Sequence, residues 1–266
     1  MSWQYVAVAA EAAVRAGAIQ KERYGQGVKV DYKGDIDLVT EVDHACEAAI
    51  LEVIRSRCPD HDIITEETDL ALTGSPFVWI VDPLDGTTNF AHSYPMFCAS
   101  VALARDGEVV AGAVFDALRD ELFTAERGAG AHLNGRPLAV TTADALIQSL
   151  VITGFPYDVH EKLAERLRPF IRLLGKARGV RRGGSAALDL SYIAAGRADG
   201  FWEGLLQAWD MGAGRLLIEE AGGRVTRLDG TPLGLGPDEV LATNGLIHEE
   251  LMAVLAETSK AETALV

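Results

Sequence analysis

Two carboxylates, Asp82 and Asp85, directly follow a short apolar run and are separated only by Pro83 and Leu84. Residues 77–81 are continuous in apolar character and lie between two prolines, which favours a short buried strand. The carboxylates then fall at the C-terminal end of that strand, where a tight turn over the Pro-Leu pair can direct both toward one point. Grouped carboxylate oxygens are the ligands that hard cations such as Mg²⁺ require. The spacing therefore predicts a metal site.

The residues after the second carboxylate suit the binding of an anion. Gly86 lets the backbone approach a ligand closely, and the N–H groups of residues 86–88 can open a helix whose N-terminus attracts negative charge. This is the layout of a metal–phosphate site. A purely structural explanation is also open, because Asp-Pro-Leu-Asp-Gly forms a good turn in which Asp85 caps a short helix.

The composition is that of an ordinary globular protein. The chain has 266 residues, of which 48% are hydrophobic, enough for a core in one large domain or two closely packed subdomains. A net charge of −15 argues against a nucleic-acid surface and against binding to anionic membranes. Cys46, Cys58 and Cys98 are too few and too irregularly spaced for a disulfide framework or a zinc site, which favours the reducing cytosol. The sequence shows neither a signal peptide nor a run approaching the roughly 18 apolar residues of a membrane helix.

The elements that must position the carboxylates begin with two helices and an antiparallel meander. An amphipathic helix is expected first, because apolar residues recur at helical spacing there. Thr40 followed by Asp43 has the form of a capping box, which starts the second helix. An Asp-Gly pair at residues 106–107 separates two apolar runs, which favours a hairpin. The predicted helices cover residues 3–23 and 41–57, with a strand or hairpin arm over 28–36 and strands over 61–64, 95–104, 108–116 and 121–124.

The second half of the chain alternates strands with helices, which indicates an α/β layer. Glycines at the expected helix ends support this interpretation. Asp210 stands where the N-cap of a helix should stand, and Gly222 ends that helix. The predicted strands cover residues 150–153, 200–202 and 239–242, the other helices 160–174, 185–195 and 246–256, and the tail 257–266 is expected to be flexible.

The other acidic residues that could do chemistry also have structural explanations. Asp43 and Asp210 can be helix caps, the pair at residues 66–67 can be a solvated loop, and Gly-Gly-Ser at 183–185 can be an N-cap. The six histidines are scattered without metal-ligand spacing. Neither a G-x-S-x-G string nor a Cys/His pair indicates a catalytic nucleophile.

The strand followed by D-P-L-D-G-T-T-N at residues 82–89 resembles the signature of the inositol monophosphatase family, magnesium-dependent phosphatases of small phosphate monoesters. Other parts of the family pattern follow in order: D-L-V-T-x-x-D at 37–43, Glu-Glu at 66–67 and W-D-M-G-A-G at 209–214. The resemblance covers essentially the whole chain. It implies an α+β fold, a layered α-β-α-β-α sandwich, as a single domain over residues 1–266 with subdomains over about 1–140 and 141–266.

The resemblance also implies roles for particular residues. The expected ligands of two or three Mg²⁺ ions are Glu66, Asp82, Asp85, Asp210 and the carbonyl of Leu84. Glu66 and Thr87, the latter oriented by Asp43, are expected to guide the nucleophilic water, with Glu67 beside them. The expected substrate contacts are Gly86, Thr87, Thr88, Gly184, Ser185, Glu203 and Asp210. Lys33 matches a lysine on a mobile loop beside the metal site, in a segment one residue shorter here than in some relatives.

The implied activity is hydrolysis of a small phosphorylated polyol or sugar by metal-activated water, without a covalent phosphoenzyme, in a cytoplasmic, lithium-sensitive homodimer. Residues 153–158 (T-G-F-P-Y-D) look like the corresponding segment of bacterial inositol-1-phosphate phosphatases, so inositol 1-phosphate is expected first. Fructose 1,6-bisphosphate, histidinol phosphate and adenosine 3′,5′-bisphosphate are alternatives, because relatives that hydrolyse them share the metal apparatus. A regulatory protein-binding role with incidental phosphatase activity is a second class of function.

Overall fold

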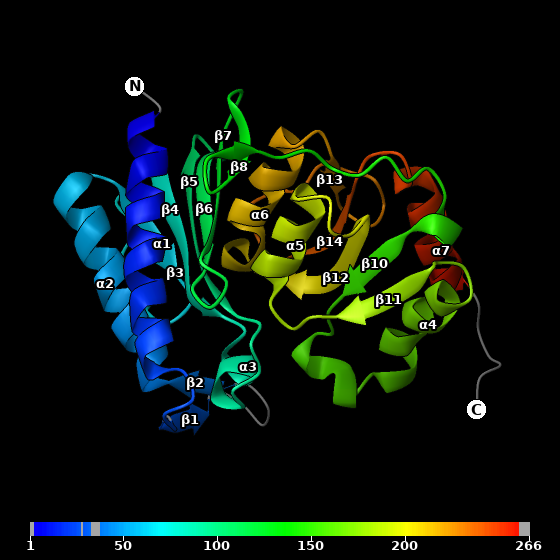
Figure 1. The fold of residues 1–266 in the computed structure, drawn as a ribbon, viewed down its shortest axis with the longest axis horizontal. Helices are drawn as coiled ribbons and strands as arrows, with labels where there is room; N and C mark the ends of the chain where they lie inside the picture. The colour runs from blue at the N-terminus through cyan, green and yellow to red at the C-terminus, as the bar shows by residue number, and fades with distance from the viewer. Residues whose placement is uncertain (1–2, 28, 33–37, 261–266) are drawn as a thin grey trace.

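The computed structural model describes residues 3–27, 29–32 and 38–260 and stacks them in alternating layers of helix and sheet (Figure 1). In order, the layers are α1 (Trp3–Arg23) with α2 (Glu41–Arg57), a seven-stranded sheet, α5 (Ala186–Ala194) with α6 (Ala208–Glu220), a five-stranded sheet, and α4 (Leu163–Leu174) with α7 (His248–Lys260). The predicted α-β-α-β-α sandwich is confirmed. Within the described ranges, no helix is both long enough and apolar enough to cross a membrane.

The seven-stranded sheet carries the acidic motif on its second strand. The strands, in the order in which they lie side by side, are β3 (Asp62–Thr65), β4 (Phe77–Asp85), β5 (Cys98–Arg105), β6 (Glu108–Asp116), β7 (Glu121–Glu126), β8 (Gly130–Leu133) and β9 (Arg136–Pro137). Only β3 and β4 run parallel in this sheet, and the pairs from β4 to β9 are antiparallel. The predicted meander is therefore confirmed. A separate two-stranded pair, β1 (Val30–Tyr32) and β2 (Leu38–Thr40), leads into α2.

The five-stranded sheet is mixed. Its strands, in spatial order, are β11 (Gly179–Arg182), β10 (Leu150–Thr153), β12 (Gly200–Leu206), β14 (Asp238–Thr243) and β13 (Arg224–Thr226). The pairs of β10 are parallel and those of β14 antiparallel. The shorter helical elements are α3 (Thr87–Ala91), η1 (Leu146–Gln148) and η2 (Tyr157–His160).

The hydrophobic core is divided between the layers. One cluster lies between α1, α2 and the larger sheet, a second surrounds α5 and α6 between the two sheets, and a third lies under α4 and α7. Fully burying a side chain such as Ile50 or Leu190 contributes about 1.5–3 kcal/mol. The two sheets are therefore held together by the middle helical layer, whose first residues reach the end of β4.

Several predicted element boundaries require correction. The helix predicted from residue 160 begins at Leu163, after the separate turn of 3₁₀ helix η2. Several short strands were not predicted, among them β8, β9 and the edge strands β11 and β13, because they lack a clear apolar alternation. Helix α7 continues to Lys260, so residues 257–260 of the expected tail are helical, and the rest of that tail lies outside the described residues.

Candidate active site

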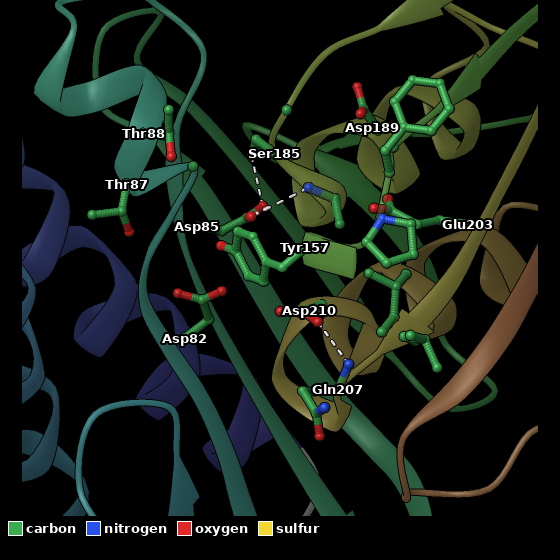
Figure 2. Close-up of a pocket in the computed structure, with 18 of the residues that line it drawn as sticks. Asp82, Asp85, Thr87, Thr88, Tyr157, Ser185, Asp189, Glu203, Gln207 and Asp210 are labelled. Carbon is green, nitrogen blue, oxygen red and sulfur yellow. Dashed lines mark hydrogen bonds between the residues drawn. The ribbon is translucent and has the colours of Figure 1, made fainter. Parts of the chain in front are cut away.

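A cavity of about 830 Å³ opens between the C-terminal end of β4, the loop after β10, and the first turns of α5 and α6 (Figure 2). It brings together residues from both halves of the chain. The predicted site residues that line it are Glu66, Asp82, Leu84, Asp85, Gly86, Thr87, Thr88, Gly184, Ser185, Glu203 and Asp210. Lys33 lies outside the described residues, and Asp43 lies behind Thr87 rather than in the cavity wall.

The prediction that a tight turn presents the acidic pair on β4 is wrong. The strand continues through Asp85, and its register with β5 shifts, because Asp82 pairs with Ser100 and Asp85 with Cys98. One extra residue on β4 forms a bulge, which bends a strand and redirects its side chains. Asp82 is 1% exposed, and its Oδ1 accepts a hydrogen bond from the backbone N–H of Leu84 at 3.0 Å.

Asp85 joins the two halves of the molecule. Its Oδ2 accepts hydrogen bonds from Ser185 Oγ at 2.6 Å and from the N–H of Ala187 at 2.8 Å, and its Oδ1 accepts one from Ala186 N–H at 3.2 Å. Figure 2 shows this carboxylate directed at the start of α5. The hydroxyl of Ser185, which was predicted as a substrate contact, is thus engaged with a carboxylate here.

Asp210 was predicted to be the N-cap of its helix, and this prediction is wrong. Helix α6 begins at Ala208, two residues earlier, because Gln207 has the extended backbone of a cap (φ −86°, ψ 169°). Asp210 is the third helical residue, and its Oδ2 accepts a hydrogen bond from the N–H of Gln207 at 2.6 Å. The carboxylate still lines the cavity, opposite β4.

The acidic residues of this cavity repel one another. Burial raises the pKa of Asp82 well above its usual value, and the charges of Glu66, Asp85 and Asp210 raise it further. Burial likewise raises the pKa of Asp210, with Asp85 and Glu66 adding to the effect. A bound divalent cation would favour the ionised forms and remove this repulsion. The carboxylates therefore suit a hard metal ion.

The donor set fits Mg²⁺ in its chemistry, since it consists only of oxygen atoms. The described part of the chain nevertheless contains no group of three His, Cys, Asp or Glu side chains already gathered in a metal-binding arrangement. Asp85 and Asp210 instead accept hydrogen bonds from N–H and O–H groups of the protein. The residues thus provide the ligands but do not form a closed cage around one point.

Asp43 serves as a helix cap and also contacts the cavity wall. Its Oδ2 accepts hydrogen bonds from the N–H of Thr40 at 2.8 Å and from Thr40 Oγ1 at 2.5 Å, which confirms the predicted capping box of α2. Its Oδ1 lies 2.9 Å from Thr87 Oγ1, which is also 3.0 Å from the carbonyl oxygen of Leu84. Burial raises the pKa of this carboxyl. The structural and the functional explanation of Asp43 are therefore compatible.

The cavity wall also contains residues that the sequence reasoning did not assign to the site, among them Tyr157, Arg182 and Asp189. Asp189 is 1% exposed, and its Oδ1 has no hydrogen-bond partner among the residues described. A carboxylate within the apolar run A-A-L-D-L was the available signal for it. Arg182 had no such signal, because it belongs to the unpredicted edge strand β11.

Glu203 lies beside these residues, and burial raises its pKa to about 8, a shift that Arg182 opposes and Asp85 increases. The unfolded chain loses this proton near pH 4.5, whereas the folded protein keeps it to about pH 8. Stability contributed by the neutral form is therefore lost as the pH rises through this window. In metal-free protein, we expect the Tm of Glu203→Gln minus that of wild type to increase by at least about 3 °C as the pH rises from 5 to 9. Thermal melts in EDTA would measure this, and a Tm difference that is constant with pH would contradict it.

Gly154 makes room for the carboxylate of Glu203. A Cβ at Gly154 would lie 2.1 Å from both carboxylate oxygens, so a larger residue must displace them. We expect Gly154→Ala to raise the KM for the expected polyol phosphate about tenfold, the equivalent of one lost hydrogen bond, with a smaller effect on kcat. Gly204→Ala is the matched control, because its nearest neighbour would be 3.7 Å away. Equal KM values in the two variants would show that the position of Glu203 does not matter for binding.

The chain matches known proteins over nearly its whole length. The model of the Inositol monophosphatase family matches residues 2–263. The Inositol-1-monophosphatase of Synechocystis sp. is 46% identical over 256 residues, which cover 96% of this chain and 89% of that protein. Nus factor SuhB of Escherichia coli is 41% identical over 249 residues, or 92% and 93% of the two chains. The structure of inositol monophosphatase from Anabaena sp. is similar with a TM-score of 0.86 and 42% identity, over 95% of each chain.

Proposed function

This chain belongs to the inositol monophosphatase family and is a phosphatase, and we propose that it hydrolyses inositol 1-phosphate to inositol and phosphate with the help of Mg²⁺. The observation that carries the proposal is the convergence of Glu66, Asp82, Asp85 and Asp210 on one cavity beside the segment 86–88. These carboxylates come from different elements of both halves of the molecule. Repulsion among these acids does not stabilise a fold, whereas a metal-dependent hydrolase needs the same acids as metal ligands.

Glu66, Asp82, Asp85, Asp210 and the carbonyl of Leu84 would hold two or three Mg²⁺ ions. When bound, the ions would neutralise the phosphate, lower the pKa of a water molecule and align the attacking and leaving oxygens. The backbone at Gly86 would accommodate the phosphate. Its φ is 94°, and a Cβ there would lie 2.9 Å from the carbonyl oxygen of Met96, so only glycine fits at this point of the cavity wall.

Thr87 would orient the water for attack. Because its hydroxyl can donate its proton to Asp43, the oxygen lone pairs are left to accept a hydrogen bond from the water, with Glu66 on the other side. The bond from the water oxygen to phosphorus would form as the ester P–O bond breaks; the water would give up one proton to Glu66, and the leaving alcohol oxygen would take up one proton from solvent. No phosphorylated side chain is needed.

The leaving inositol would lie against the second half of the chain. Glu203, Gly184 and Asp210 line that side of the cavity and can bind hydroxyl groups. The relatives named Inositol-1-monophosphatase support this substrate over other small phosphate esters. The homodimeric state, the cytoplasmic location and the sensitivity to lithium remain predictions from the family resemblance.

A regulatory role is the second candidate. The observation in its favour is the 41% identity to a protein named Nus factor SuhB. A binding role should survive the loss of a metal ligand, so pull-downs with wild type and with Asp82→Asn would separate the two functions. Partners retained equally by both proteins would support the regulatory role, and the absence of any specific partner would remove it.

Phosphate release from a panel of esters tests the proposed function. The panel should contain inositol 1-phosphate, fructose 1,6-bisphosphate, histidinol phosphate and adenosine 3′,5′-bisphosphate, each with Mg²⁺, with EDTA, and with Mg²⁺ plus lithium. We expect Mg²⁺-dependent release that is fastest from inositol 1-phosphate. Preference for another ester would retain the mechanism and replace the substrate. Absence of release from every ester would contradict the proposal.

A further inference from the structure

Gln20 is a fully buried amide on the inner face of α1, close to the end of the helix. Ala13, Ala16 and Gly17 precede it at helical spacing on the same face, and both alanines are 0% exposed. A Cβ at Gly17 would lie 2.3 Å from the Phe115 ring, so α1 approaches the sheet as closely as a glycine allows. This approach brings the side chain of Gln20 to the sheet where the acidic motif begins.

The amide of Gln20 donates to two backbone carbonyls at the bulge of β4. Its Nε2 lies 2.9 Å from the carbonyl oxygen of Pro83 and 3.1 Å from that of Cys98. Both carbonyls lie where the ladder between β4 and β5 is irregular, between the Asp82–Ser100 and Asp85–Cys98 pairs. A bulge disrupts the hydrogen bonds of a ladder. Gln20 therefore ties the two strands together from outside the sheet.

The oxygen of the same amide is a poor contributor to stability. Gln20 Oε1 is buried and has no hydrogen-bond partner in the described part of the molecule. Turning the amide over would place this oxygen against two carbonyl oxygens, so the orientation is fixed by its contacts. An unpaired buried acceptor costs about 1–3 kcal/mol, which offsets most of what two hydrogen bonds contribute at about 1 kcal/mol each. An apolar side chain of similar length would remove this unpaired oxygen but would also leave the carbonyls of Pro83 and Cys98 without the amide donor. What the amide specifically supplies is therefore the position of these two carbonyls.

We propose that Gln20 is a positioning residue of the phosphatase site: it fixes the backbone at Pro83 so that the carbonyl of Leu84 and the carboxylates on either side of the bulge keep their places in the cavity wall. The next carbonyl along the chain, that of Leu84, lies 3.0 Å from Thr87 Oγ1. The contacts thus link α1 through the bulge to the residue that would orient the water. This inference rests on the proposed function and adds a role for a helix that the sequence predicted only as amphipathic.

Two variants test this role: Gln20→Met, which keeps the shape, and Gln20→Ala, which leaves a cavity. The control is Thr226→Val, which changes a residue of the other sheet and removes its buried hydroxyl, 2.9 Å from Nε2 of His248 in α7. The readouts are the Tm in EDTA, the gain in Tm on adding Mg²⁺, the Mg²⁺ concentration that half-saturates phosphate release, and kcat and KM for the ester.

We expect both Gln20 variants to need at least about tenfold more Mg²⁺ and to show a smaller gain in Tm with Mg²⁺, although Gln20→Ala should be less stable than Gln20→Met. Thr226→Val should lose stability and keep the wild-type response to Mg²⁺. A Mg²⁺ requirement that follows the Tm across all three variants, or wild-type values in Gln20→Met, would overturn the proposal. So would failure of both Gln20 variants to fold, because the residue would then support the fold as a whole. A wild-type protein whose Tm and phosphate release both ignore Mg²⁺ would instead refute the proposed function.

Discussion

Asp82→Asn is expected to lower Mg²⁺-dependent phosphate release by about a thousandfold or more while the protein remains folded. Asp82 is 1% exposed at the bulge of β4, where burial and three other carboxylates raise its pKa. Asparagine has nearly the same shape and keeps an oxygen that can accept the hydrogen bond from Leu84 N–H. The substitution therefore removes a charge and little else. A thousandfold loss corresponds to about 4 kcal/mol of transition-state stabilisation, within the range expected of one electrostatic group.

The stability of this variant distinguishes a lost ligand from a damaged fold. Because the substitution removes one of several mutually repelling buried acids, the Tm of Asp82→Asn in EDTA should equal or exceed that of wild type. Asp62→Asn is the contrasting control, since the carboxylate of Asp62 binds the N–H groups of Thr73, Gly74 and Ser75 at the other end of the sheet. Asp62→Asn should melt earlier and retain its activity. Turnover near the wild-type rate in Asp82→Asn would count against the site.

Thr87→Val is expected to lower kcat by about a hundredfold, because it removes the hydroxyl between Asp43 and the cavity. The valine side chain fills the same space without a proton to donate or a lone pair to accept a hydrogen bond. Thr87→Ser keeps the hydroxyl and should stay within a few-fold of wild type. Initial rates at saturating Mg²⁺ and substrate would measure this, and equal rates in the valine and serine variants would contradict a role for the hydroxyl.

Asp43→Asn is expected to have a similar effect through a reversed hydrogen bond. Thr40 donates two hydrogen bonds to Asp43 Oδ2, so an asparagine oxygen would take that place and its NH₂ group would face Thr87. The hydroxyl of Thr87 would then accept a hydrogen bond where it now donates one. The helix cap would be preserved, so kcat should fall while the Tm changes little. A parallel fall of both would indicate that Asp43 acts only as a cap.

The long elements could be predicted because their periodicity is clear, as in the meander from β5 to β7, whereas the layering of helices and sheets was predicted from the family resemblance. The edge strands β11 and β13 could not, because they are short and their pairing depends on neighbours far along the chain. Most of the predicted site residues line one cavity because they follow strands or open helices on facing layers. The bulge between Asp82 and Asp85 was predicted as a turn, since local sequence does not show that β5 continues to pair beyond it.

Gln20 and Asp189 illustrate a signal that was present but not used. Each is a polar residue on a helix face that is otherwise apolar, and the structure places both beside the cavity or its supporting backbone. Asp210 shows the opposite limit. Its position two residues inside α6 depends on the backbone of Gln207, which spacing alone does not fix.

The central claim is that phosphate hydrolysis depends on divalent cations held by these carboxylates. Its most direct test is the rate of phosphate release from inositol 1-phosphate as a function of free Mg²⁺, for wild type and for Asp82→Asn. Wild type should show no release in EDTA and a saturable rise with Mg²⁺, and Asp82→Asn should remain near zero throughout. Release by wild type that is independent of Mg²⁺, or a rise with Mg²⁺ that Asp82→Asn shares, would contradict the claim.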